Sequence, residues 1–277
     1  METTCPLCNN VQTKFLFNKQ SSPFYQCVSC KFIFSKPLTN PNLANTITDF
    51  EPAYLNYLNP QLHDKKNHEV VIKRLSRYAD LDNARILDIG CGSGKFVQYL
   101  RLKGYNARGL EPSTALFETF LVTQGQYYNS DVHTFRQEHP NERFDIITIT
   151  DVLEHIEDPQ AFMKEVTAML TLGGVLLIST PNAGSLFARM AGKGWHYYNR
   201  YHLSLFSKKT LSQLMEAHGF STLMLKHLAR HHSLYYILKY GLNFVLHREK
   251  GIPSFLTNIT IPVNLHDNLY GVFRKNT

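Results

Sequence analysis

Residues 84–100 of this chain read ARILDIGCGSGKFVQYL. An apolar run rises to Asp88, glycines follow at 90, 92 and 94, and apolar residues then recur at helical spacing. The pattern predicts a buried strand, a tight turn and the start of a helix. Glycine permits positive φ and brings backbone N–H groups close to a ligand at the helix N-terminus.

Strand-like and helix-like segments alternate around this stretch. The predicted strands are residues 85–89, 105–110, 126–129, 144–150, 174–179, 221–228 and Asn268–Arg274. The predicted helices are residues 63–80, 94–103, 113–124, 158–170 and 207–219, with a further helix-like stretch at 233–247. Such alternation predicts an α/β fold, with a mostly parallel sheet and helices on both faces.

Four acidic residues fall at or just past predicted strand ends. They are Asp88, Glu111, Asp131 and Asp151. Ligands of parallel sheets bind outside the carboxyl ends of the strands, so we expect these side chains to share one edge. Asp131 has a second interpretation, in which it forms a local turn after a short strand.

The glycine turn departs from the dinucleotide fingerprint, because Lys95 stands where a sixth-position glycine is required. It resembles instead the glycine motif of class I S-adenosylmethionine-dependent methyltransferases. The resemblance continues through FDIITITDVLEHIEDP (144–159) and GGVLLISTPN (173–182), in the family's order and spacing. It covers roughly residues 70–220.

The resemblance implies a seven-stranded Rossmann-like methyltransferase sheet whose last strand is antiparallel to its neighbours. It also implies S-adenosyl-L-methionine as cofactor, with Glu111 on the ribose and Asp131 on the adenine. The expected cofactor-binding residues are Asp88, Gly90, Gly92, Gly94, Glu111, Asp131 and Asp151.

His155 is the first candidate for a general base, because it resembles the histidine of the V-L-E-H segment in ubiquinone-type O-methyltransferases. A histidine with a pKa near neutrality can deprotonate an acceptor hydroxyl or activated carbon. In the alternative interpretation His155 has no catalytic role and only stabilises the loop that contains it. Tyr54, in a segment that methyltransferases of this type fold over the site, and His196, in the aromatic loop 183–206, are further candidates. For Tyr54 and His196 the alternative is a purely structural role, in which their side chains pack against the domain.

Two Cys-x2-Cys pairs lie near the N-terminus, separated by eighteen residues. The ligand set would be Cys5, Cys8, Cys27 and Cys30. The spacing predicts a tetrathiolate Zn²⁺ site, structural because all four ligand positions are filled. A disulfide pairing is the alternative, and the absence of a secretion signal argues against it.

These features divide the chain into a zinc ribbon (1–36), a linker or lid (37–66) and a methyltransferase domain (67–277). Within the last, 183–206 is an acceptor loop and 229–265 an insertion before the final strand. The longest apolar region, 233–246, is too short to span a bilayer, so we expect a cytoplasmic protein.

Positive charge is concentrated at both ends of the chain, with four Lys against one Glu in 1–44 and seven Lys or Arg against two acids in 221–277. This charge fits an anionic partner, although scattered solvated lysines would give the same count. The resemblance to sugar and natural-product methyltransferases implies a small-molecule acceptor, phosphorylated or nucleotide-linked. An RNA methyltransferase and a non-catalytic cofactor-binding partner module are the alternatives.

Overall fold

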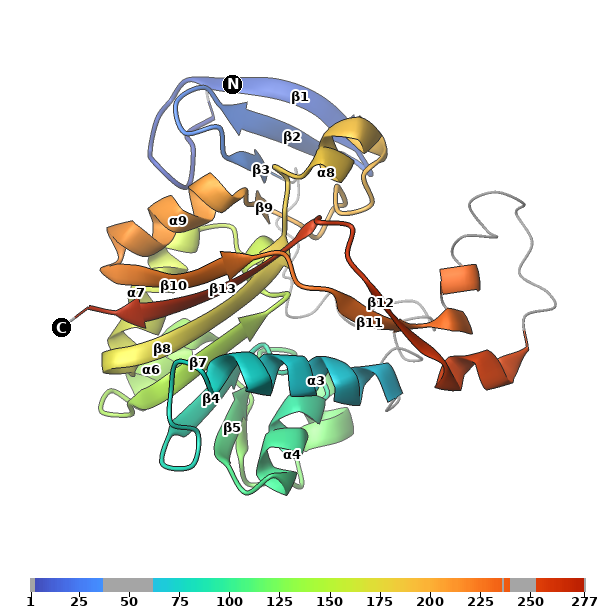
Figure 1. Cartoon of the computed structure of the whole chain (residues 1–277). Coiled ribbons are helices and arrows are strands. Elements are labelled where there is room, and N and C mark those ends of the chain that lie inside the picture. The colour runs from blue at the N-terminus through green and yellow to red at the C-terminus, as the bar shows by residue number, and fades with distance from the viewer. Residues whose placement is uncertain (1–2, 37–61, 236, 240–252, 277) are drawn as a thin grey trace.

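A seven-stranded sheet lies at the centre of the computed structural model, which describes residues 3–36, 62–235, 237–239 and 253–276 (Figure 1). β4 to β8 run parallel, and β13 is antiparallel to both of its neighbours. In spatial order the strands are β10 (Phe220–Lys226), β13 (Asn268–Lys275), β8 (Leu170–Pro181), β7 (Phe144–Thr150), β4 (Arg85–Ile89), β5 (Asn106–Leu110) and β6 (Tyr127–Tyr128).

Helices cover both faces of the sheet. Successive side chains of a strand point to opposite faces, so the apolar strands present a hydrophobic surface on each face for helices to bury. In β4, Ile86 packs in one apolar cluster and Leu87 in the other. The first cluster includes α3 (Leu62–Leu75) and α4 (Lys95–Leu102). The second includes α6 (Val132–Glu138), α7 (Pro159–Met169) and α9 (Lys208–Ala217). The predicted α/β fold, a seven-stranded sheet with helices on both faces, is therefore confirmed.

Some local elements differ from the sequence prediction. The helix expected over 113–124 divides into α5 (Thr114–Leu116) and a π-helical turn over Phe117–Leu121. Helix α6 was not predicted; it begins where the side chain of Asp131 accepts from the Thr134 amide.

The N-terminal segment forms an antiparallel ribbon that shares its sheet with the main domain. Its strands are β1 (Thr13–Lys19), β2 (Ser22–Cys27) and β3 (Ile33–Ser35). The fourth strand, β9 (Ser204–Leu205), comes from the loop after β8 and pairs with β3. In Figure 1 the ribbon lies beside α8 (Leu186–Ala191).

A two-stranded arm, β11 (Arg230–Ser233) with β12 (Thr260–Val263), projects beyond the ends of β10 and β13, to the right in Figure 1. Two hydrogen bonds between Asn67 and the backbone of His231 attach its base to α3. The helix expected over 233–247 begins at 234 instead, since Ser233 belongs to β11, and its second half lies outside the described residues.

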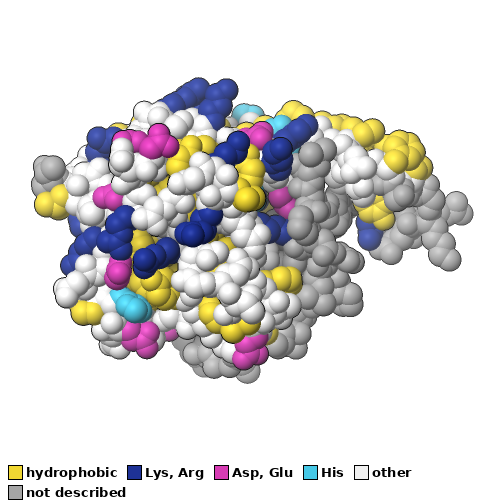
Figure 2. Space-filling view, turned by 90° about the horizontal axis from the view of Figure 1, so that it is seen from below, with side chains coloured by type: hydrophobic (Ala, Val, Ile, Leu, Met, Phe, Trp, Pro, Cys, Tyr) yellow, Lys and Arg dark blue, Asp and Glu magenta, His cyan; other side chains and the backbone are white. Residues whose placement is uncertain are grey.

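Within the described ranges, no helix has the length and apolar character needed to cross a lipid bilayer. Figure 2 shows the underside of the molecule, where the coloured Lys and Arg side chains are interspersed with acidic and apolar ones. The positive charge expected from the sequence is therefore not gathered into one continuous surface on this face.

Candidate active site

The glycine turn after β4 contains three residues with left-handed backbone, with φ of +69° at Gly90, +56° at Gly92 and +75° at Gly94. A Cβ on Gly90 would lie 2.4 Å from Val152 Cγ2, and one on Gly94 would lie 2.7 Å from Leu121 Cδ2. A Cβ on Gly92 would meet nothing within 4 Å. Packing therefore requires glycine at 90 and 94, whereas Gly92 borders open space in which a ligand can approach the backbone.

Glu111 follows β5 and its buried carboxylate faces this turn. One oxygen accepts the Gly92 amide at 2.8 Å and the other accepts the Ser113 amide at 2.9 Å. Burial raises the pKa of the carboxyl, and the two amide bonds oppose that rise. Each carboxylate oxygen can accept more than one hydrogen bond, so Glu111 can also accept ligand hydroxyls.

Asp88 lies inside the sheet, where its carboxylate accepts the Thr148 hydroxyl of β7 at 2.6 Å. Burial raises its pKa to about 7. The contact ties β4 to β7 directly below the glycine turn, so Asp88 supports the strand from which the turn departs.

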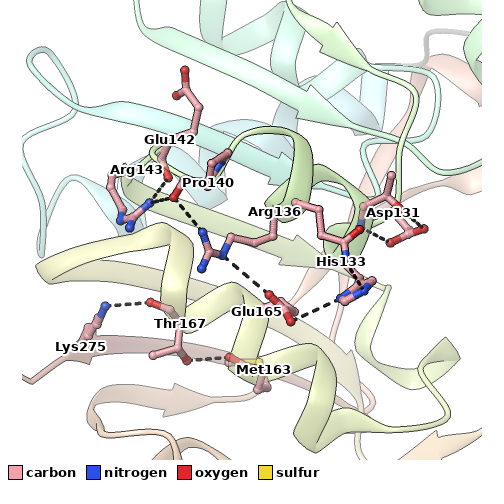
Figure 3. Close-up of polar contacts among 12 residues, drawn as sticks. Asp131, His133, Arg136, Pro140, Glu142, Arg143, Met163, Glu165, Thr167 and Lys275 are labelled. Atoms are coloured by element: carbon pink, nitrogen blue, oxygen red, sulfur yellow. Dashed lines mark hydrogen bonds and ion pairs between the residues drawn. The ribbon is translucent and has the colours of Figure 1, made fainter.

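Asp131 is exposed at the start of α6 (Figure 3). Its two oxygens accept the amide and the hydroxyl of Thr134, each at 2.9 Å, which makes it the N-cap of the helix. The same helix is joined to α7 by Arg136 and His133, which both approach Glu165. The turn role considered for Asp131 is therefore present, and it leaves lone pairs available for a ligand.

Asp151 directly follows β7, has a left-handed backbone (φ +57°) and is paired with other side chains. Nη2 of Arg230, at the base of the arm, lies 2.6 and 2.7 Å from its two oxygens. Ser179 donates to the same carboxylate at 3.1 Å. Arg230 also donates from Nε to the Tyr270 hydroxyl, so four elements of the chain converge at this point.

A second polar cluster lies in the turn after Asp151. Polar atoms of Glu154, His155 and His202 lie within 4.8 Å of one another. Glu154 is buried and accepts the Thr180 hydroxyl at 2.9 Å. Burial, with the charge of Asp151, raises the pKa of Glu154 to about 8.

Both histidines of this cluster are fixed by backbone carbonyl oxygens. Nδ1 of His155 lies 3.0 Å from the Tyr201 oxygen, and Nδ1 of His202 lies 2.8 Å from the Tyr197 oxygen. A carbonyl only accepts, so Nδ1 carries the proton and Nε2 is left as an acceptor. Burial lowers the pKa of both rings, that of His202 to about 3, and keeps them neutral.

His196 is not among the three residues whose polar atoms converge in this cluster. His196 is exposed, and its ring lies against that of Tyr197 with centroids 4.0 Å apart. Tyr54 falls outside the described residues.

The four cysteines of the ribbon converge with their sulfurs within 4.8 Å of one another. Cys5 Sγ lies 3.7 Å from Cys30 Sγ, and Cys8 Sγ lies 3.6 Å from Cys27 Sγ. These separations exceed a disulfide bond and match the roughly 3.8 Å between sulfurs placed tetrahedrally around Zn²⁺ at about 2.3 Å. The donor set therefore fits zinc.

Comparison with known proteins identifies the family. Residues 63–225 match the family model described as a methyltransferase domain. The chain belongs to this family. A ubiquinone biosynthesis O-methyltransferase of Bradyrhizobium sp. is 32% identical over 124 residues, which are 44% of this chain and 49% of that protein. One of the same name from Rickettsia canadensis is 28% identical over 118 residues, or 41% and 50%. The chain thus spans about half the length of the curated relatives it matches.

Solved methyltransferase structures share the fold. The 1,6-didemethyltoxoflavin-N1-methyltransferase of Burkholderia thailandensis superimposes with a TM-score of 0.54 at 14% identity, covering 90% of this chain and 98% of that one. A SAM-dependent methyltransferase of Archaeoglobus fulgidus gives 0.52 at 18% identity, covering 75% and 94%. At these identities the likeness establishes the fold of the methyltransferase domain.

Several side chains in these contacts were not predicted as site residues from the sequence, and three of them are central. They are Thr148, Arg230 and His202. Thr148 is a polar residue within the buried run of β7, which is a readable signal. Arg230 and His202 meet their partners across 79 and 47 positions of the chain, so no local pattern marks them.

Proposed function

We propose that this chain transfers a methyl group from S-adenosyl-L-methionine to a small-molecule acceptor, by in-line displacement with a general base. The observation that carries the proposal is the pairing of Gly92 with Glu111. Gly92 has a left-handed backbone and borders open space, and its amide donates to the buried carboxylate of Glu111. Both residues lie at the carboxyl ends of parallel strands, where such sheets bind ligands.

The cofactor would be held by residues from three strands. Glu111 would accept its ribose hydroxyls, Gly92 would admit it to the backbone, and Asp131 would accept its adenine amino group. Gly90, Gly94 and Asp88 would support the turn, and Asp151 would lie toward the acceptor side. S-adenosyl-L-methionine, when bound, supplies a methyl group already activated on a sulfonium, so the protein's task is positioning and proton removal.

His155 is the candidate base. Its Nδ1 is held by the Tyr201 carbonyl, which leaves Nε2 unprotonated and aimed away from that bond. A neutral imidazole can accept the proton of an acceptor hydroxyl as the methyl group is transferred. His202 packs edge-on at 4.8 Å between ring centroids and restricts the orientation of His155.

We infer a nucleotide-linked sugar or a related phosphorylated metabolite as the acceptor. The segment 183–215 contains no Asp or Glu, and it carries Arg189, Lys193, Arg200, Lys208 and Lys209. A hollow of about 760 Å³ opens beside the end of β8, with Lys208, Lys209 and His227 on its wall. These basic groups favour the approach of a phosphorylated compound.

The four cysteines would hold one structural Zn²⁺, because all four positions of a tetrahedral ion would be occupied by sulfur.

Calorimetry with S-adenosylhomocysteine tests the cofactor assignment. We expect micromolar binding by the wild type and a loss of at least about tenfold in Glu111→Ala, because the ribose acceptor is removed. Glu118→Ala is the matched control, since Glu118 is exposed in the neighbouring turn. A folded wild type that binds no S-adenosylhomocysteine would overturn the enzyme proposal.

Mass spectrometry then tests the acceptor class, with nucleotide sugars and RNA offered in parallel. Mass gain of 14 Da per methyl on a nucleotide sugar is expected from the exchange of hydrogen for a methyl group, and about 100-fold slower transfer is expected from His155→Ala. If only RNA is methylated, and its affinity falls steeply with salt concentration, the acceptor is a nucleic acid and the nucleotide-sugar proposal is wrong.

A further inference from the structure

The edge strand of the ribbon is paired with the loop that carries His202. Ile33 and Phe34 of β3 align with Leu205 and Ser204 of β9. The Ser35 amide extends the ladder by donating to the Leu203 carbonyl at 2.9 Å. Backbone pairing of this kind fixes the loop's register against the ribbon.

Side chains reinforce the same junction. Trp195 and Tyr198 of the loop pack with Phe24 of β2 in a buried aromatic cluster, in which the Tyr198 ring lies 5.1 Å from Phe24 and 5.2 Å from Trp195. Lys19 Nζ donates to the Trp195 carbonyl at 2.9 Å. The loop is therefore held at both of its ends by the ribbon.

From this junction, hydrogen bonds lead directly to the candidate base. The Leu203 amide donates to the Glu154 carbonyl at 2.7 Å, and the Ser204 hydroxyl donates to the Ile156 carbonyl at 2.7 Å. Nδ1 of His155 donates to Tyr201. Three consecutive residues of the turn after β7 thus depend on the loop for their position.

The cysteines flank the strands that hold the loop. Cys27 ends β2, and its amide donates to the Phe32 carbonyl at 2.9 Å. The ring of Phe32 packs on Phe206, immediately after β9, with centroids 4.9 Å apart. A segment as short as 3–36 cannot bury a large core of its own, so a bound metal would supply much of its folding free energy.

We propose that the ribbon is a metal-dependent brace for the acceptor side of the site. Metal bound by the four cysteines fixes segment 195–206, and through it the positions of His155 and His202. The cofactor cleft at Gly92 and Glu111 is built on β4 and β5 and does not depend on the brace. Only the catalytic consequence of the brace rests on the proposed function.

Trp195 is the chain's single tryptophan and is buried in the junction, so its fluorescence reports the brace without any acceptor. We expect chelation of the metal to shift its emission to the red, and added Zn²⁺ to reverse the shift. Binding of S-adenosylhomocysteine should change by less than about twofold, because its residues lie on other strands. Methyl transfer should fall by about 100-fold, since the base is displaced.

Cys30→Ser should reproduce the metal-free state, and Val28→Ala, in the same knuckle but exposed, is its control. If the cysteine variant fails to fold, Phe24→Ala provides a second test, because it removes a ring of the junction and leaves all four cysteines in place. It should shift the Trp195 emission while the zinc content stays at one ion per chain.

If metal removal leaves the emission of Trp195 unchanged, the proposal that the metal-bound ribbon fixes segment 195–206 is wrong. Loss of secondary structure and cofactor binding together with the shift would also overturn it, because the effect would then be global unfolding. A wild type that binds no S-adenosylhomocysteine would contradict the proposed function, while the fluorescence comparison would still decide the brace.

Discussion

The guanidinium of Arg230 contacts both carboxylate oxygens of Asp151, although the two residues belong to the arm and to the end of β7. Asp151 lies beside the buried Glu154, whose pKa it raises. Arg230 therefore compensates the charge of Asp151 at the proposed acceptor side and ties the base of the arm to the sheet.

Replacing Arg230 by Leu should destabilise the protein by about 1–2 kcal/mol, because its charge-assisted hydrogen bonds to Asp151 are lost at a partly buried site. Urea unfolding measures the change. In a double-mutant cycle with Asp151→Asn, the second substitution should cost much less once the first is present. Additive losses would show that the pair contributes no net stability.

Gly92→Ala and Gly104→Ala form a matched pair, since both glycines have positive φ and neither Cβ would meet an atom within 4 Å. Each substitution should cost about 1 kcal/mol through backbone strain. Only Gly92→Ala should weaken S-adenosylhomocysteine binding, by at least about tenfold. If the two variants bind S-adenosylhomocysteine with equal affinity, Gly92 does not line the cofactor cleft.

Glu154→Gln should alter the pH dependence of stability. The raised pKa of Glu154 means that the folded state binds more protons than the unfolded state between about pH 4.5 and 8, so wild-type stability falls as pH rises through this window. Nearby Asp151, Arg230 and the neutral His155 set the local charge.

Gln stays neutral and can still accept the Thr180 hydroxyl, so the variant should gain on the wild type by up to about 1.4 kcal/mol per pH unit. Unfolding curves at pH 5 to 8 measure the difference, with Glu118→Gln as the exposed control. A constant difference across this range would mean that Glu154 is ionised throughout.

Asp131 combines a helix cap with the proposed adenine contact, and two substitutions separate them. Asp131→Ala should lower stability by about 1 kcal/mol through loss of the N-cap. Asp131→Ser should recover most of that stability, because serine also caps helices, while its shorter side chain leaves S-adenosylhomocysteine binding several-fold weaker. Wild-type affinity in Asp131→Ser would make the residue a cap alone.

The core of the methyltransferase domain was predictable because its signals are local. Apolar runs marked β4 and β7, and the glycines after Ile89 marked a turn that requires left-handed backbone. Helix α6 was missed because seven residues with two buried positions, Val132 and Phe135, give too short a pattern for helical periodicity.

The proposed acceptor side was less accessible to sequence reasoning, because its contacts are distant in the chain. His155 stood in a recognisable motif, yet the contacts of His202 with His155 and of Arg230 with Asp151 depend on tertiary folding. Strand β9 is two residues long and exists through its pairing with β3, which no local propensity indicates.

The pairing of Ile33 with Leu205 also imposes an order of events during synthesis. About 170 residues separate the two partners, which at about 5–20 residues per second is a delay of roughly 10–30 s on the ribosome. Throughout that interval β3 presents an open edge that can recruit other nascent strands. Its length of three residues limits that hazard, and a chain interrupted before position 204 would keep the edge exposed permanently.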